Sequence, residues 1–430
     1  MPAHFPKMID ITREYPASPV WDFSAELSRQ FVAQNVLVQL KPGARIAIGV
    51  GSRGIANLSQ IVSAVIRILK EAGARPFIVP AMGSHGGATP EGQKEVLAEY
   101  GVTAESMGVP IEAQMDTRRI GVSDNGVEVF FSEAALPADG IVVINRVKPH
   151  TDFAGAIGSG VMKMIAIGLG KQRGAAACHA AASHLGHEAV IRAVSKVSLA
   201  ATPILCAVAI VEDQNHQTAE VRVLRPESIR QEEEQLFVRA SALMPALPFD
   251  VVDLLIVDFI GKDVSGAGMD SNITGRSVHG YISSLHPGSG VTRHISRIFV
   301  RDLTPATNGN AIGIGLADFT TSRAVRKTDW HATYVNSLTA MTPPTAKIPI
   351  HFETDEECIS HAIVSLALAP SAKPRILRIL NTLSLTSLQA SEAYLDEILT
   401  RKDLTALRPA RDMEFDSQRN LLPVQLPAAP

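Results

Sequence analysis

The first half of the chain alternates between apolar runs typical of buried strands and segments typical of helices. The strand candidates are 44–51, 74–84 and 138–149, each an apolar run bounded by glycine, proline or polar residues. Between them, 58–73 has apolar residues at helical spacing. The segment 89–101 has helix start and stop signals, with Thr89 as the predicted N-cap, Pro90 at the first helical position and Gly101 past the end. Alternation of this kind predicts an α/β fold built on a mostly parallel, doubly wound sheet.

The length of the chain predicts two domains, because 430 residues exceed what one hydrophobic core usually holds. A further apolar strand at 251–261 opens the second domain. We therefore predict an N-terminal α/β domain over 1–250 and a C-terminal α/β domain over 251–384, with 385–430 packing back on the first. The end of the tail, 414–430, is rich in Pro, Leu and Gln and is expected to be loosely held. The active site is expected in the cleft between the domains.

The composition excludes several classes of protein. The net charge is −3 and the basic residues are dispersed, which argues against a nucleic-acid partner. The start lacks the apolar stretch of a secretory signal, and no apolar run approaches a membrane span. The 3 cysteines are widely spaced and form no CxxC pair, which favours a reducing compartment. We predict a cytoplasmic globular protein without a membrane partner, in which the charged run 231–235 is a solvated helix face.

Polar residues follow four of the predicted strands at the point where each strand ends. Arg53 follows the first, His85 lies in a Gly-Ser-His-Gly-Gly turn after the second, and His150 ends the Lys-Pro-His that follows the third. Lys262 follows the strand at 251–261. Because ligands bind beyond the carboxyl ends of parallel strands, we expect these four side chains at one rim. Two histidines there suit acid–base chemistry, and the planar guanidinium of Arg53 suits a carboxylate or phosphate.

The stretch 146–179 is apolar and rich in glycine, yet it contains Lys163, Lys171 and His179. Within 154–169, the one charged residue is Lys163. A core disfavours buried cations, and a surface loop does not need so much Gly, Ile and Met. The stretch therefore predicts a chemical role for its cations.

Two interpretations of the histidines as metal ligands have less support in the sequence than acid–base chemistry. His184 and His187 can share a helix face, but they lack the carboxylate of an HExxH motif. A metal-dependent hydrolase built on His85, His150 and His179 would need acidic ligands, and the acidic residue near His150 in sequence is Asp152.

The order and spacing of these residues resemble the nickel-dependent lactate racemase family, over 40–190 and more weakly over 250–340. The resemblance is carried by an arginine, the histidine of GSHGGATPEG, the histidine of VKPH, a lysine in a glycine-rich loop and a later histidine. From Lys163 to His179 is 16 positions, and from His85 to His150 is 65. The family implies an isomerase, a racemase or epimerase of a 2-hydroxy acid.

The resemblance also implies a cofactor and the roles of the site residues. The cofactor is pyridinium-3,5-bisthiocarboxylic acid mononucleotide, a nickel-pincer nucleotide tethered to a lysine, whose nickel takes an imidazole in a square-planar site. Transfer of the substrate's α-hydrogen as hydride avoids a carbanion beside a carboxylate, and two histidines serve as acid and base for the two enantiomers. The predicted residues are His85 and His150 as the catalytic pair, Lys163, Gly158 and Gly160 for the cofactor, His179 for nickel, and Arg53, Lys262 and Arg276 for the substrate.

Two departures from the family pattern have consequences. The approach to the lysine, GAIGSGVMK, is unusual and the interval from His150 is about three residues longer, so that Lys171 is the alternative tether. The loop 263–276 offers Asn272, Thr274 and Arg276 as polar contacts, which predicts a substrate other than lactate. The competing interpretation is a non-catalytic or cofactor-handling relative that binds an anionic metabolite or nucleotide. The expected partners are a 2-hydroxy acid and the host's cofactor-synthesis proteins.

Overall fold

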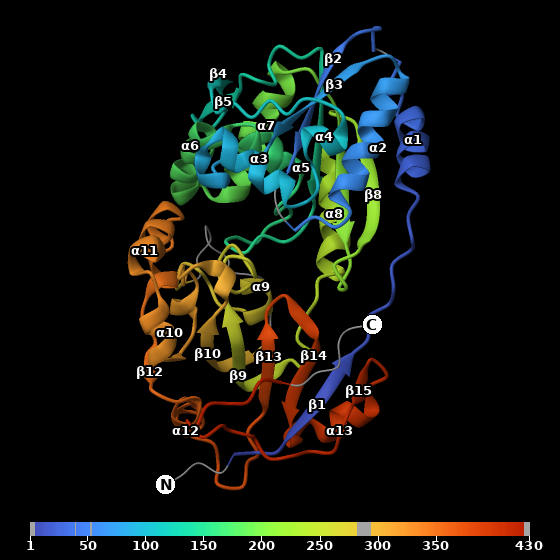
Figure 1. The fold of residues 1–430 in the computed structure, drawn as a ribbon. Coiled ribbons are helices and arrows are strands. Elements are labelled where there is room, and N and C mark those ends of the chain that lie inside the picture. The colour runs from blue at the N-terminus through green and yellow to red at the C-terminus, as the bar shows by residue number, and fades with distance from the viewer. Residues whose placement is uncertain (1–4, 39, 52–53, 282–293, 425–430) are drawn as a thin grey trace. The chain divides into compact units, whose positions relative to one another are not determined.

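The computed structural model describes residues 5–38, 40–51, 54–281 and 294–424, and its chain divides into two compact units. The N-terminal unit comprises Ala17–His150 and Gly155–Met244, and the C-terminal unit comprises Met1–Pro16, Thr151–Ala154 and Pro245–Pro430. Both are α/β units with parallel-rich sheets, as predicted (Figure 1). Among the described residues, no helix is long and apolar enough to cross a membrane.

The N-terminal unit is built on a parallel sheet whose strands appear in the order β3-β2-β6-β7-β8 within the described part of the chain. The pairs β2–β3, β2–β6 and β6–β7 are parallel, and β8 is antiparallel to β7. A separate hairpin joins β4 to β5. The bounds are β2 (Arg45–Val50), β3 (Arg75–Pro80), β4 (Thr117–Val122), β5 (Glu128–Ser132), β6 (Gly140–Arg146), β7 (Ile204–Glu212) and β8 (Thr218–Leu224).

Helices cover both faces of this sheet because the side chains of its strands alternate between two cores. Ile46 and Ile48 of β2 belong to a cluster with apolar residues of α1 and α2, whereas Gly49 faces Leu169 on the other side. The predicted strands β2, β3 and β6 and the predicted helices α2 and α3 are confirmed, and these are the elements with the strongest local sequence patterns. The helices are α1 (Phe23–Ala33), α2 (Leu58–Glu71), α3 (Pro90–Ala98), α4 (Ala104–Met107), α5 (Val161–Lys163), the π-helical turn η2 (Met164–Gly168), α6 (Lys171–Leu185), α7 (His187–Ala201) and α8 (Ile229–Ala242).

The edge strand β8 has its outward backbone groups paired by side chains. The Gln30 amide donates to Val221 O at 2.8 Å and accepts from Val223 N at 2.6 Å, as a neighbouring strand would. Trp21 Nε1 donates to Thr218 O at 2.9 Å. An edge whose backbone groups are already bonded offers less to another strand.

The C-terminal unit is built on a mixed sheet in the order β12-β11-β10-β9-β13-β14-β1-β15 within the described residues. Strands β12 to β13 of this order run parallel, and β14, β1 and β15 continue the sheet by antiparallel pairing. The strands are β1 (Met8–Arg13), β9 (Val251–Ile260), β10 (His294–Leu303), β11 (Phe319–Thr321), β12 (Ile350–Phe352), β13 (Ile376–Asn381), β14 (Ser384–Ser391) and β15 (Leu404–Ala406). The helices are α9 (Ser271–Thr274), α10 (Ser322–Lys327), α11 (Trp330–Thr339), α12 (Asp355–Ser365) and α13 (Leu395–Thr400).

This sheet differs from the predicted domain division at both ends of the chain. After Met244 the chain leaves the N-terminal unit and continues in the C-terminal unit from Pro245, close to the boundary predicted at 250/251. However, β14 and β15 pair with β1, so 384–406 belong to the C-terminal sheet together with the first strand of the chain. The physical reason is backbone hydrogen bonding, because β1 lies between β14 and β15 and pairs with both.

The tail was predicted to be loosely held over 414–430, but its described part, up to residue 424, is held by buried charges. Arg378 is bidentate to Asp258 at 2.9 Å for both contacts, and it also donates to Leu422 O. Asp355, which is 0% exposed, accepts from Arg301 and from the backbone N–H of Leu421. Buried charges require partners, and here the tail backbone supplies some of them.

Candidate functional site

Two parallel strands of the N-terminal sheet, β3 and β6, lead to His85 and His150 at the same edge of the sheet, on either side of β2. Arg53 follows β2, His85 follows β3 and His150 follows β6, and these strands are neighbours in the order β3-β2-β6. Arg53 itself lies outside the described residues. Lys262 follows β9, which belongs to the C-terminal sheet and not to the sheet whose strands precede the other three residues. The apolar run at 251–261 does form a parallel strand, but a local pattern of apolar residues does not show which sheet that strand joins.

The turn that carries His85 is fixed by close backbone contacts. Gly83 has φ +62 and donates from its backbone to Gly168 O at 3.1 Å. Gly86 has φ +65, and a Cβ there would overlap the backbone of Gly92 in α3. The predicted cap of α3 is confirmed, since Thr89 Oγ1 accepts from Gly92 N. The His85 side chain is partly exposed at the end of this turn.

His150 and Lys163 are brought together by a backbone bridge. Lys148 N donates to Ser159 O at 2.8 Å, and Ser159 N returns a bond to Lys148 O at 2.9 Å. The side chains beyond this bridge meet, with 2.5 Å between Lys163 Nζ and His150 Nε2. If the ammonium donates, the neutral imidazole accepts through Nε2 and carries its proton on Nδ1.

Lys163 is the exception in a buried segment. From Gly160 to Lys171 every residue is buried except Lys163, which is partly exposed. Lys171 is 0% exposed and donates to Pro80 O at 2.8 Å and to Gln93 Oε1 at 2.9 Å. Burial lowers the pKa of Lys171 to about 8. A lysine that must react with a soluble cofactor has to reach solvent, which favours Lys163 over Lys171 as the tether.

The glycines before Lys163 are required by packing against other parts of the protein. A Cβ on Gly158 would overlap Lys148 O and approach the Phe237 ring, at 2.8 Å. A Cβ on Gly160 would overlap the carboxylate of Glu233. Asn145, which is buried at the end of β6, donates to Gly160 O at 2.9 Å. These contacts fix the backbone from which Lys163 projects.

Glu233 is a buried carboxyl that the sequence analysis assigned to a solvated face. It is 0% exposed, and it accepts from Met162 N at 2.8 Å. Its Oε1 has no hydrogen-bond partner among the described residues. Burial raises the pKa of Glu233 to about 7, against the opposing effect of the Met162 and Val161 backbone amides. The spacing of Ile229, Glu233, Leu236 and Ala240 was the available signal, because these positions share the buried face of α8.

The histidines of α6 and α7 pair differently from the predicted alternative. The rings of His179 and His187 lie edge to face with centroids 6.0 Å apart, and both are partly exposed. His184, the predicted partner of His187, is exposed. The reason is that Gly186 ends α6, so that His187 begins a new helix instead of continuing the face of His184. Within the described ranges, no group of three or more His, Cys, Asp or Glu could hold a metal ion.

The predicted substrate contacts from the C-terminal unit take part in local interactions. Lys262 Nζ donates to Gly266 O at 3.0 Å. Arg276 forms an ion pair with Asp318 at 2.7 Å, and both side chains are about one-third exposed, at 31% and 32%. The polar side chains of Asn272 and Thr274 hydrogen-bond to Asp270 within their own turn. The structure thus gives these residues a local structural role, and their role in binding substrate stays a prediction.

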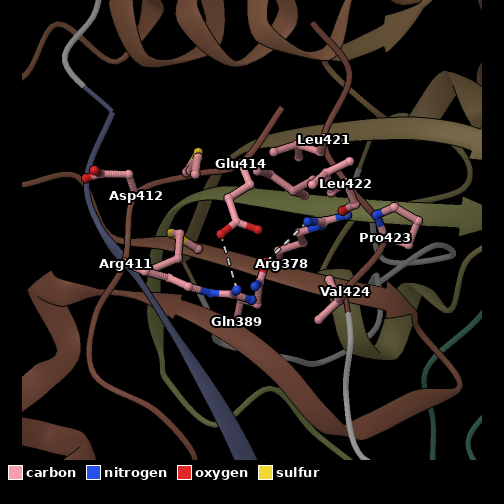
Figure 2. Close-up of a pocket in the computed structure, with 12 residues that line it drawn as sticks. Arg378, Gln389, Arg411, Asp412, Glu414, Leu421, Leu422, Pro423 and Val424 are labelled. Atoms are coloured by element: carbon pink, nitrogen blue, oxygen red, sulfur yellow. Dashed lines mark hydrogen bonds and ion pairs between the residues drawn. The ribbon is translucent and has the colours of Figure 1, made fainter. Parts of the chain in front are cut away.

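A small cavity in the C-terminal unit lies beneath the tail. Figure 2 shows Arg378, Gln389, Arg411 and Glu414 around it, together with Leu421 and Leu422 of the tail. Its volume of about 30 Å³ is close to the space of one water molecule in the liquid. It is too small for a metabolite, and its polar groups already bond one another and the tail.

The comparisons with known proteins give a family and a fold. A family model described as "Domain of unknown function (DUF362)" matches residues 45–259, half of the chain. The chain belongs to the DUF362 family. The match covers every strand of the N-terminal sheet and the turns that carry His85, His150 and Lys163. No curated protein matches the sequence of this DUF362 member.

Two solved structures resemble this DUF362 protein over most of its length. A protein from Thermotoga maritima has a TM-score of 0.52 at 10% identity, over 86% of this chain and 99% of that one. The lactate racemase apoprotein from Thermoanaerobacterium thermosaccharolyticum has a TM-score of 0.50 at 15% identity, over 88% of this chain and 99% of that one. At these identities the likeness shows a shared, lactate-racemase-like fold.

Proposed function

We propose that this DUF362 protein is an isomerase that inverts the configuration of a 2-hydroxy carboxylic acid, using a nickel-pincer nucleotide tethered to Lys163. The observation that carries the proposal is the placement of Lys163. It is the partly exposed side chain of the buried segment from Gly160 to Lys171, and its Nζ lies 2.5 Å from His150 Nε2. The lactate-racemase-like fold and the sequence spacing support the same assignment.

The residues around Lys163 fit such a cofactor. The Lys163 amine would form the tether, and the partly exposed imidazole of His179 would bind nickel. Asn145 donates to Gly160 O and Glu233 accepts from Met162 N, so the backbone just before Lys163 is held and the tether would start from a rigid base. When bound, the cofactor supplies a hydride acceptor for the α-hydrogen of the substrate.

His85 and His150 are the proposed acid–base pair. Each follows a strand that is hydrogen-bonded to β2, and each is partly exposed. One imidazole would take the proton of the substrate hydroxyl and the other would return a proton after inversion. Imidazole suits both tasks because its pKa lies near neutrality. Arg53 is proposed to pair with the substrate carboxylate, with Lys262 and Arg276 as helpers.

The tether is tested by peptide mass spectrometry and nickel analysis of protein from a host that makes the cofactor. We expect an added mass on the peptide containing Lys163 and about one nickel per chain. The peptide containing Lys171 serves as the internal control and should be unmodified. An unmodified Lys163 in that host would refute the proposal and favour an anion-binding relative.

The chemistry is tested by isomerisation of 2-hydroxy acids in D₂O. Hydride transfer returns the substrate's own hydrogen, so the inverted product should contain no deuterium at the α-carbon. Deuterium in the product would indicate proton abstraction instead. His85→Asn and His150→Asn should each lower kcat by about 100-fold or more, since a general acid or base contributes 10² to 10⁴. The matched control is His184→Asn, an exposed histidine of α6, which should leave kcat unchanged.

A further inference from the structure

Lys171 and Gln93 form a buried polar pair that the proposed chemistry does not use. Lys171 is 0% exposed, and both of its acceptors, Pro80 O and Gln93 Oε1, are neutral. Its backbone also has φ +51, a left-handed conformation that non-glycine residues rarely adopt. A buried cation without a carboxylate and a strained backbone both cost stability, so this arrangement calls for a functional reason.

Gln93 connects this lysine to the turn that carries His85. The Gln93 side chain is 0% exposed, and its Nε2 donates to Gly83 O at 2.9 Å and to His85 O at 3.4 Å. An ammonium group can only donate, so its bond to Oε1 fixes which end of the amide faces the turn. Lys171 therefore determines that Gln93 presents donors to both carbonyls.

The same turn is also bonded to the segment that carries Lys163. Gly83 N donates to Gly168 O at 3.1 Å, and Gly168 ends the π-helical turn that begins directly after Lys163. Lys171 lies a few residues further along and reaches back to Pro80 at the end of β3. Three hydrogen bonds thus connect the turn to Gln93 and to the segment between Lys163 and Lys171.

We infer that Gln93 and Lys171 are positioning residues, which hold the His85 turn in register with the Lys163 segment. The inference deepens the proposed function and rests on it for the role of His85 as acid or base. Displacing a catalytic group by about 1 Å can cost on the order of 100-fold in rate. Buried Lys171 orients the Gln93 amide, and this amide in turn orients the turn that carries His85.

Two substitutions separate positioning from general stability. Gln93→Met removes both the donor and the acceptor at similar volume. Gln93→Glu keeps an acceptor for Lys171 but replaces the donor to Gly83 O and His85 O with an oxygen. If Gln93→Met does not fold, Gln93→Glu still tests the inference because it retains a partner for the buried ammonium. The matched control is Gln389→Met, which removes a buried glutamine of the C-terminal unit that bonds Arg378 and Asp10.

The first measurement is amide hydrogen exchange of cofactor-free protein over residues 83–88. Both Gln93 variants should raise exchange there by about tenfold or more, the factor that corresponds to losing a hydrogen bond of ordinary strength. Gln389→Met should not change it. Unchanged exchange in both Gln93 variants would overturn the inference whatever the protein catalyses.

The second measurement is steady-state isomerisation by cofactor-loaded protein. The Gln93 variants should lose about 10- to 100-fold in kcat. KM should stay within about threefold and the mass added to Lys163 should be unchanged, because neither depends on His85. Faster exchange with wild-type kcat would overturn the inference. If the Gln93 variants exchange faster but the wild-type protein isomerises no 2-hydroxy acid, the hydrogen-bond network is supported and the proposed function is refuted.

Discussion

Replacing Glu233 by Gln should change how the stability of the N-terminal unit depends on pH. Glutamine mimics the protonated acid, so the variant has no buried carboxylate. In the wild-type protein, burial raises the pKa of Glu233 from 4.5 to about 7. Between these values the unfolded chain releases its proton first, so the free energy of unfolding falls as pH rises through this window. Above pH 7 the loss is complete, and a shift of this size corresponds to about 3 kcal/mol.

The assay is urea unfolding at pH 5 and at pH 8, with fluorescence of the N-terminal unit as the signal. The chain has 2 Trp, of which Trp21 lies in the N-terminal unit and Trp330 in the C-terminal unit. A Trp330→Phe background therefore reports on the N-terminal unit alone. The stability gained by Glu233→Gln should be larger at pH 8 than at pH 5 by about 2–3 kcal/mol. Glu232→Gln, which alters the unburied neighbour, is the control.

An equal effect of Glu233→Gln at the two pH values would refute the reasoning. It would mean that the carboxylate is as well solvated or paired in the folded state as in the unfolded chain. The pKa of Glu233 would then not be raised, although its Oε1 is buried without a hydrogen-bond donor among the described residues.

Three further substitutions test other parts of the structure, each by urea unfolding. Gly160→Ala should lower the free energy of unfolding by about 1–3 kcal/mol, because its Cβ overlaps the Glu233 carboxylate, and adding Glu233→Ala should restore part of the loss. Asp355→Ala should cost about 3–5 kcal/mol because it removes a buried carboxylate that pairs with Arg301 and Arg323, whereas Glu353→Gln on the exposed ion pair with Arg326 should cost at most about 1 kcal/mol. Gln30→Leu should cost about 1 kcal/mol and speed amide exchange along β8, since it removes two hydrogen bonds from that edge.

The sequence predicted those features that depend on local patterns. The strands β2, β3, β6 and β9 were all found from apolar runs, and the start of α3 from Thr89 followed by proline. Buried parallel strands are nearly continuous hydrophobic runs, and a helix cap depends on neighbours in sequence. The meeting of His150 and Lys163 was expected only through the family resemblance, because it depends on the bridge between Lys148 and Ser159.

Features set by distant partners were not predicted. The tail was expected to be loose because its composition is that of a mobile segment, but Asp355 and Arg378 bind its backbone from far away in the sequence. Gln93 has no sequence signal that separates it from a surface glutamine, since its partners Lys171 and Gly83 meet it only in the fold. The helical spacing of Glu233 with Ile229 and Leu236 indicated a buried position, but its acidic neighbours in the charged run 231–235 favoured the prediction of a solvated face.

The position of β1 between β14 and β15 in the C-terminal sheet constrains the order of events during synthesis. Thr12 pairs with Ser387 on one side and with Thr405 on the other, so neither neighbour exists until almost the whole chain has been made. At about 5–20 residues per second, the apolar strand waits roughly 20–80 s on the ribosome for its partners. During that interval Ile9 and Ile11, which are 1% and 0% exposed in the finished fold, have no native strand to cover them. A chaperone that binds short extended apolar segments would find its earliest substrate here.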